Sequence, residues 1–202
     1  MSEKVIHAAL LGLGTVGTGV YKVMKAEEEE MTAKLGCKVE ITRILVRNLE
    51  KAAARVEDSS VLTNNWEDIE KDPSIDIVIE LIGGIEPART YILAALRSGK
   101  NVVTANKDLI AVHGREILET AEAAHKDIMF EAAVAGGIPI IAPLKHSLSA
   151  NHVTEVMGIV NGTTNFILTK MSQEGMEFED ALALATELGY AEADPTADIE
   201  GI

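Results

Sequence analysis

Apolar and polar residues alternate in two patterns along the first two-thirds of the chain. Val5–Leu11 is a mainly apolar run before a glycine-rich turn, which is typical of a strand buried on both faces of a sheet. Residues 15–34 have apolar side chains at helical spacing and acidic ones opposite, so we expect a helix that Gly36 ends. Further strands are predicted at residues 39–46, 61–63, 75–82, 101–104 and 128–134, and further helices at residues 51–55, 87–97 and 115–125.

Short strands that alternate with helices predict βαβ units with right-handed crossovers. The predicted fold class is therefore α/β, with a Rossmann-type doubly wound parallel sheet. The pattern changes near residue 134, before a segment of structure breakers, Gly136-Gly137-Ile138-Pro139. Beyond it we expect a helix, then a strand at residues 153–160, and a helix at residues 179–188 that Gly189 ends. We predict one domain at residues 1–134 and the start of a second, α+β domain at residues 135–202.

A glycine motif follows the first predicted strand directly and opens the first predicted helix. Its residues are Gly12, Leu13, Gly14, Thr15, Val16 and Gly17. Between a strand and a helix, the first glycine permits a tight turn, the second lets the backbone approach a pyrophosphate, and the third lets the helix pack on the sheet. The N–H groups at the helix start attract the same anion. Residues 1–134 are thus predicted to bind NAD or NADP, with all six motif residues in the cofactor site.

The end of the second predicted strand indicates which dinucleotide binds. An acidic residue there would hold the ribose 2′-hydroxyl of NAD, whereas a basic residue would bind the 2′-phosphate of NADP. Here the strand ends beside Arg47, with Lys51 one helical turn further on and no acidic residue at the strand end. Because the guanidinium fork suits phosphate oxygens, we predict NADP as the preferred cofactor and NAD as the second candidate. The alternative is a surface arginine without a ligand.

Parallel sheets place ligands at the carboxyl ends of their strands, so residues directly after the other strands are further candidates. Gly83 follows the strand at residues 75–82, and we assign it to the cofactor site. Lys107 follows the strand at residues 101–104 and could bind substrate, orient the nicotinamide or be an ordinary solvated lysine. The five histidines have no metal-ligand spacing, so no zinc site is expected.

Composition narrows the range of partners. The chain has 32 acidic and 18 basic residues, a formal net charge of −14. Such a field repels nucleic acid and anionic membranes, so we expect neither as a partner. The single cysteine, Cys37, cannot form an internal disulfide, and no apolar run approaches the roughly 20 residues of a membrane span. The start of the chain also has no secretory leader pattern. We expect a cytoplasmic protein that binds small molecules.

Five motifs along the chain resemble those of the homoserine dehydrogenases. They are the glycine motif at 12–17, Thr-Ala-Asn-Lys at 104–107, Glu-Ala-Ala-Val-Ala-Gly-Gly-Ile-Pro at 131–139, Gly-Ile-Val-Asn-Gly-Thr-Thr-Asn at 158–165 and Gly-Tyr-Ala-Glu-Ala-Asp-Pro at 189–195. The last two are the most specific, because a general Rossmann protein has no reason to carry them. The resemblance implies an oxidoreductase that interconverts L-aspartate 4-semialdehyde and L-homoserine with NAD(P)H, in threonine, methionine and isoleucine biosynthesis.

The resemblance also implies roles for individual residues. Glu192 would bind the ammonium group of the substrate, and Lys107 would be a catalytic residue where the nicotinamide meets the substrate. Gly189 would contact the cofactor. The family's monovalent cation, usually sodium, would have as ligands Glu131 and the backbone carbonyls of Val134, Gly136 and Ile138.

The end of the chain departs from the family pattern. In the family, an aspartate and a catalytic lysine follow shortly after the Glu-Ala-Asp-Pro loop, whereas this chain ends at Ile202. Residues 135–202 would then be part of a substrate-binding and dimerisation domain, and we expect a homo-oligomer with cofactor binding but little turnover by these 202 residues. The alternatives are a non-catalytic module that binds or senses dinucleotides, and a related oxidoreductase acting on another small aldehyde or hydroxy acid.

Overall fold

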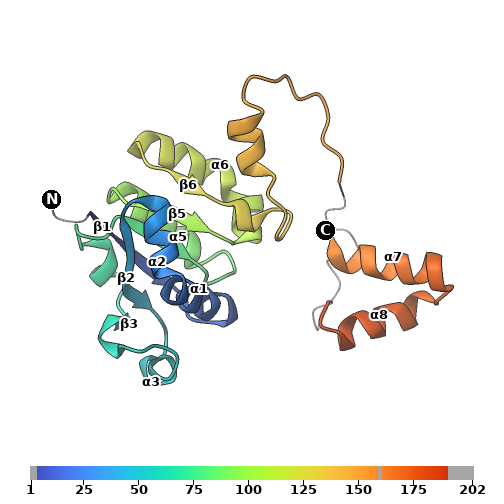
Figure 1. Ribbon diagram of the computed structural model, residues 1–202, viewed down its shortest axis with the longest axis horizontal. Coiled ribbons are helices and arrows are strands. Elements are labelled where there is room, and N and C mark those ends of the chain that lie inside the picture. The colour runs from blue at the N-terminus through green and yellow to red at the C-terminus, as the bar shows by residue number, and fades with distance from the viewer. Residues whose placement is uncertain (1–3, 159–160, 191–202) are drawn as a thin grey trace. The chain divides into compact units, whose positions relative to one another are not determined.

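A six-stranded sheet is the frame of the computed structural model, which describes residues 4–158 and 161–190 (Figure 1). Its strands all run parallel, in the order β3-β2-β1-β4-β5-β6. They are β1 Val5–Leu11, β2 Lys38–Leu45, β3 Leu62–Thr63, β4 Ile77–Glu80, β5 Asn101–Thr104 and β6 Ile128–Met129. The strand order reverses between β1 and β4, which confirms the predicted Rossmann-type doubly wound sheet.

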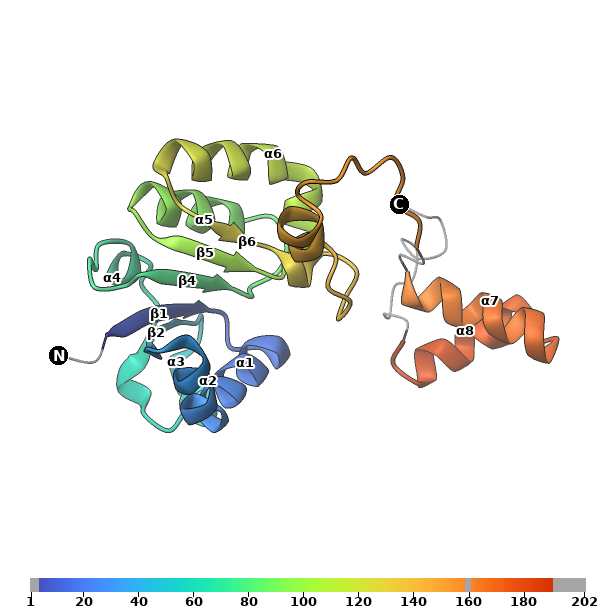
Figure 2. The same ribbon diagram turned by 45° about the horizontal axis from the view of Figure 1, so that its top comes forward.

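Helices cover both faces of this sheet (Figure 2). They are α1 Thr15–Ala26, α2 Glu28–Leu35, α3 Leu49–Ala53, α4 Glu67–Glu70, α5 Ala88–Arg97 and α6 Lys107–Ala124. The helices α1 to α3 lie on one face, and α5 and α6 lie on the other. The strand β1 shows why both faces are apolar, because Ala8 and Leu10 pack into the core under α1 and α3, while Ala9 and Leu11 pack into the core under α5 and α6.

The predicted helix at residues 15–34 is in fact two helices, since α1 and α2 meet at Glu27. Glu27 ends α1, is the N-cap residue of α2 and begins a run of four glutamates at residues 27–30. Starting a new helix at Glu28 places three of them in its first turn, where the positive end of the helix dipole favours them.

Two further predictions were wrong in their bounds. The helix predicted at residues 115–125 begins at Lys107, because the Asn106 side chain caps it by accepting a hydrogen bond from the Leu109 N–H (3.1 Å). The strand predicted at residues 128–134 ends at Met129, the last residue that pairs with β5. The chain then turns through η2, a short 3₁₀ helix at Glu131–Ala133.

The structure divides into two compact units, residues 1–143 and 144–202. In the second unit, α7 (Gly162–Glu174) and α8 (Phe178–Glu187) pack through a small core of Ile167, Ala181 and Ala185. The strand predicted at residues 153–160 is absent from residues 153–158, which have no regular structure, and residues 159 and 160 lie outside the described part. A strand requires a partner for its backbone groups, and the described residues provide none here. The domain boundary at residues 134/135 stays a prediction.

Candidate cofactor site

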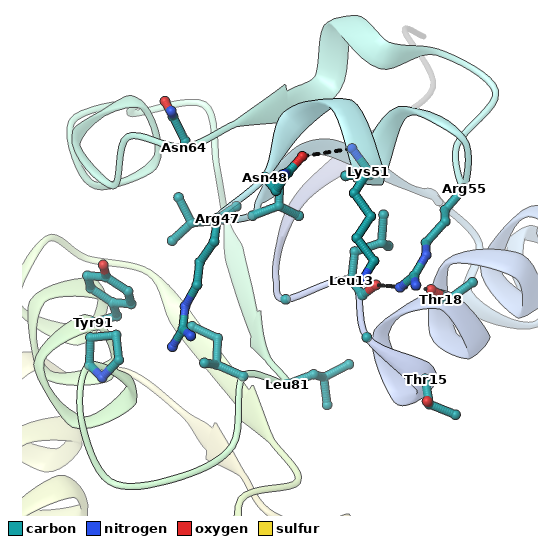
Figure 3. A pocket seen from close by; sticks show the side chains of 17 residues that line it. Leu13, Thr15, Thr18, Arg47, Asn48, Lys51, Arg55, Asn64, Leu81 and Tyr91 are labelled. Carbon is teal, nitrogen blue, oxygen red and sulfur yellow. Dashed lines mark hydrogen bonds between the residues drawn. The ribbon is translucent and has the colours of Figure 1, made fainter.

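A cleft of about 1040 Å³ opens at the carboxyl ends of β1, β2 and β4 (Figure 3). It lies at the point where the strand order reverses, which is where doubly wound sheets bind their ligands. The glycine loop forms its floor with Gly12, Leu13, Gly14 and Thr15, and Thr18 of α1 continues it. The other lining residues come from the last residue of β2 and from the segments after β2, β3 and β4: Leu45, Val46, Arg47, Asn48, Lys51, Ala52, Arg55, Asn64, Leu81, Ile82, Pro87 and Tyr91.

Two of the motif glycines are required by the close approach of other backbone atoms. Gly12 has a φ of +93°, and a Cβ atom there would lie 2.9 Å from the Leu81 carbonyl oxygen. A Cβ atom on Gly17 would lie 2.2 Å from the Gly12 carbonyl oxygen, which no side chain can accommodate. Gly14 differs, because nothing lies within 4 Å of its Cβ position. Its lack of a side chain therefore leaves open space in the cleft, as expected for contact with a pyrophosphate.

The N-terminus of α1 faces the same loop. Gly14 precedes the helix and offers no side-chain cap to the first N–H groups, and the first turn contains no acidic residue. Thr15 and Val16 are exposed there. Uncapped N–H groups together with the positive end of the helix dipole suit a phosphate group.

Three basic side chains enter the cleft from the segment after β2 (Figure 3). Arg47 extends on the side of Tyr91, and Lys51 and Arg55 extend on the side of Leu13. Within the described part of the chain, neither Arg47 nor Lys51 forms an ion pair, so both charges are available to an anion. Arg55 donates a hydrogen bond to the Leu13 carbonyl oxygen, which Thr18 also contacts through its hydroxyl group (3.2 Å).

Sequence reasoning did not single out Arg55 or Tyr91. Arg55 lies one helical turn after Lys51, so spacing alone could have indicated it. Tyr91 lies on α5 and stacks on Trp66, with ring centroids 4.6 Å apart. Tyr91 lines the cleft on the side away from Leu13 (Figure 3), and no local motif marks it.

Gly83 and Lys107 lie outside the residues that line the cleft, at the carboxyl ends of β4 and β5. Gly83 is exposed and has a φ of +78°, in the loop that follows β4. Lys107 is exposed and is the first residue of α6. Both strands lie on the far side of β1 from β2, so these two residues neighbour the half of the site opposite the basic cluster.

A buried hydrogen-bond network joins these two strand ends, and sequence reasoning missed it. Glu80 is fully buried and accepts hydrogen bonds from the Ile82 N–H (2.7 Å), the Gly83 N–H (3.3 Å) and the Thr104 hydroxyl group (2.6 Å). The only available signal was an acidic residue at the end of an otherwise apolar strand.

The segment proposed for cation binding folds around the Glu131 carboxylate. This group accepts hydrogen bonds from the N–H groups of residues 140, 141 and 142, at 2.5, 2.8 and 2.7 Å. Those bonds hold the pKa of Glu131 below its ordinary value, the Ile140 N–H having the largest effect. Val134, Gly136 and Ile138 lie in the intervening loop, where Gly136 has a φ of +59°. No group of three or more His, Cys, Asp or Glu side chains suited to a metal occurs among the described residues.

The remaining predicted residues lie in the second unit. Gly189 follows α8 with a φ of +77°, and the Thr163 hydroxyl group donates a hydrogen bond to the next carbonyl oxygen, that of Tyr190 (2.6 Å). This bond joins the Asn-Gly-Thr-Thr-Asn motif to the start of the Gly-Tyr-Ala-Glu-Ala-Asp-Pro motif. Glu192 lies outside the described residues.

The doubly wound sheet, the glycine loop and the cleft at the switch point define a dinucleotide-binding protein of the Rossmann class. Residues 12–131 match the family model of the homoserine dehydrogenase NAD-binding domain, and residues 139–202 match the homoserine dehydrogenase model. The chain belongs to the homoserine dehydrogenase family. None of the helices in the described ranges is both long enough and apolar enough to cross a membrane.

Individual relatives agree with this assignment. The chain is 51% identical over 199 residues to homoserine dehydrogenase of Bacillus subtilis (strain 168), covering 98% of this chain and 46% of that protein. The crystal structure of a homoserine dehydrogenase from Thiobacillus denitrificans superimposes with a TM-score of 0.89 at 52% identity, over 98% of this chain and 46% of the other. A hyperthermophilic archaeal homoserine dehydrogenase in complex with NADPH gives a TM-score of 0.82 at 27% identity, over 98% of this chain and 66% of the other. The chain thus spans about half the length of the curated relatives it matches.

Proposed function

We propose that this chain binds NADPH as the cofactor-binding part of a homoserine dehydrogenase, which interconverts L-aspartate 4-semialdehyde and L-homoserine. The observation that carries the proposal is the cleft at the switch point, which lies within the segment matching the family's NAD-binding domain. NADPH supplies a hydride to the aldehyde carbon, and a proton completes the hydroxyl group, giving homoserine and NADP⁺. The wider role would be in threonine, methionine and isoleucine biosynthesis, by a cytoplasmic homo-oligomer that assembles through residues 135–202.

The preference for NADP over NAD rests on the basic cluster. Arg47 would hold the 2′-phosphate in a bidentate manner, and Lys51 would add a second positive charge. Arg55 would keep the glycine loop in place through the Leu13 carbonyl oxygen. The NADPH complex of the archaeal relative supports this choice of cofactor.

The pyrophosphate would lie on the glycine motif at residues 12–17, which brings the nicotinamide toward β4 and β5. Gly83 would contact it from the loop after β4, and Gly189 would contact the cofactor from the second unit. Lys107 would donate a hydrogen bond to the carbonyl oxygen of the aldehyde, where negative charge develops as the hydride arrives. Glu192 would bind the ammonium group of the substrate.

The donor set of the proposed cation site fits a monovalent cation. It combines one carboxylate, Glu131, with three backbone carbonyls, so all ligands are hard oxygen atoms. We propose that sodium binds there and stabilises the loop at residues 131–142. Sodium chloride would then raise the melting temperature more than choline chloride at equal ionic strength, and E131Q would abolish the difference.

The reaction is tested by joining residues 1–202 to the remaining C-terminal part of the Bacillus subtilis relative. We expect reduction of NADP⁺ that depends on L-homoserine, and a rate about 10²–10³-fold lower in K107A with little change in NADPH affinity, because one charge-stabilising donor is lost. A chimera that melts cooperatively and binds NADPH but does not oxidise homoserine would contradict the proposed reaction.

A further inference from the structure

The carboxylate of Glu80 is the only acidic side chain that is fully buried among the residues the structure describes. No lysine, arginine or histidine forms an ion pair with it there. Burying a carboxylate without compensating hydrogen bonds is very unfavourable, and three donors compensate it here. Two of these donors are backbone N–H groups of the loop after β4, so the buried group organises that loop.

The network continues from Glu80 to the start of α6. The Thr104 hydroxyl group donates to Glu80 and accepts from the Asn106 N–H (3.0 Å). The Asn106 amide group then returns to the first loop, donating to the Gly84 carbonyl oxygen (2.7 Å). The loop after β4 and the junction between β5 and α6 are therefore joined at two points, through Glu80 and through Asn106.

Asn106 has two separate functions in this network. Its side-chain oxygen caps α6, of which Lys107 is the first residue, while its side-chain nitrogen holds the Gly84 carbonyl oxygen. The position of Gly83 and Gly84 relative to Lys107 is thus set by hydrogen bonds that buried side chains form with each other and with the backbone. Both glycines have left-handed backbone conformations, with φ of +78° and +70°.

We propose that Glu80 is a positioning residue for the nicotinamide half of the cofactor site. Through Thr104 and Asn106, it fixes the spacing between the loop at residues 82–84 and the first turn of α6. This inference rests on the proposed function, because it assumes that a dinucleotide extends from the glycine loop toward β4 and β5. It assigns to Glu80 no contact with substrate or cofactor.

The test compares two ligands that differ only in the nicotinamide half. NADPH spans the whole site, whereas 2′-phospho-ADP-ribose lacks the nicotinamide. We expect T104V to weaken NADPH binding about tenfold, because the loop at residues 82–84 and the first turn of α6 would no longer be held at the spacing that the nicotinamide half requires, and to change the affinity for 2′-phospho-ADP-ribose less than twofold. T104S retains the hydroxyl group and should bind both ligands as the original chain does.

The chain provides a closely matched control at Thr63. Its buried hydroxyl group also ends a parallel strand, donates to a carboxylate, that of Asp68 (2.5 Å), and accepts from the N–H two residues further on (3.0 Å). T63V should leave the ratio of the two affinities unchanged. If T104V does not fold, N106D serves instead, because it keeps an oxygen that can cap α6 and replaces the donor to Gly84 by a carboxylate oxygen, which repels that carbonyl group.

The outcomes distinguish this inference from the proposed function. If T104V and N106D weaken the binding of both ligands to the same extent, or weaken the binding of neither, the positioning role of Glu80 is overturned. The proposed function would not be affected by that result. Equal affinity of the original chain for NADPH and 2′-phospho-ADP-ribose also overturns the positioning role, because the nicotinamide would then contribute nothing. If the original chain binds neither ligand, the proposed function fails and this inference fails with it.

Discussion

At the residue scale, the charge of the cofactor cleft is opposite in sign to that of the whole protein. The chain carries a formal net charge of −14, yet Arg47, Lys51 and Arg55 are the charged side chains that line the cleft. Solvent screening reduces interactions beyond about 8 Å at physiological ionic strength, so a bound phosphate senses mainly these near cations. The local cluster can therefore select an anion that the protein as a whole would repel.

The first prediction concerns Arg47. We expect R47A to raise the Kd for NADPH about tenfold to hundredfold and the Kd for NADH less than twofold, because only NADPH carries the 2′-phosphate that the guanidinium would hold. Isothermal titration with both cofactors measures this. R97A removes the same charge from the exposed end of α5 and should leave both constants unchanged. An unchanged ratio in R47A would show that another group selects the cofactor.

A second prediction concerns the acid stability conferred by Glu131. Its folded pKa lies below the unfolded value, so its contribution is complete above the unfolded pKa and is lost as the pH falls through the folded pKa. We expect E131Q to lower the melting temperature at neutral pH. The two melting temperatures should begin to converge below pH 4.5 and become equal only once the pH has fallen through the lowered folded pKa. E119Q, at an exposed position on α6, is the control. A difference in melting temperature between E131Q and the original chain that stays the same at all pH values would contradict this role.

At the element scale, different positions of the glycine loop serve the fold and the proposed ligand. Gly17 is required by the fold, because its Cβ position meets the Gly12 carbonyl oxygen, whereas Gly14 faces open space. The same motif therefore contains one position that the fold requires and one that it does not, which we propose leaves room for the ligand.

The third prediction uses this contrast. We expect G14A to change the free energy of unfolding by no more than about 0.5 kcal/mol while weakening NADPH binding at least about tenfold, since a methyl group would occupy the space for the pyrophosphate. G17A should lower the free energy of unfolding by about 1–3 kcal/mol, because the loop must move. Urea denaturation and NADPH titration measure the two effects. Normal NADPH affinity in G14A would place the pyrophosphate elsewhere.

The elements that sequence patterns predicted well are those with strong local signals. β1 and β5 have the predicted bounds, because each apolar run stops at a clear change in pattern. The start of α6 was missed, because the Asn106 cap was not recognised. The break between α1 and α2 places three glutamates in the first turn of a helix, a signal that hydrophobic periodicity does not detect.

The same distinction applies to the candidate site. The glycine motif and Arg47 were found from sequence, because their signals are local. The contact of Arg55 with Leu13 spans 42 residues and that of Glu80 with Thr104 spans 24, so neither could be found before the strand order was known. Residues whose role depends on tertiary contacts need the fold itself.

At the scale of the whole molecule, the chain contains a complete doubly wound sheet and a second compact unit. The sheet provides the cofactor cleft, and of the residues proposed to contact the substrate, Lys107 lies within residues 1–143 and Glu192 within residues 144–202. Cofactor binding can therefore be measured on this chain, while the reaction is a proposal about a protein of roughly twice its length.

The most direct test of the central claim is a calorimetric titration of the chain with NADPH and, separately, with NADH. We expect one NADPH site per chain and a Kd for NADPH at least about tenfold below that for NADH, since a 2′-phosphate held by Arg47 adds about 1.4 kcal/mol or more. The absence of saturable binding of either cofactor would contradict the account, and equal Kd values would contradict its assignment of Arg47.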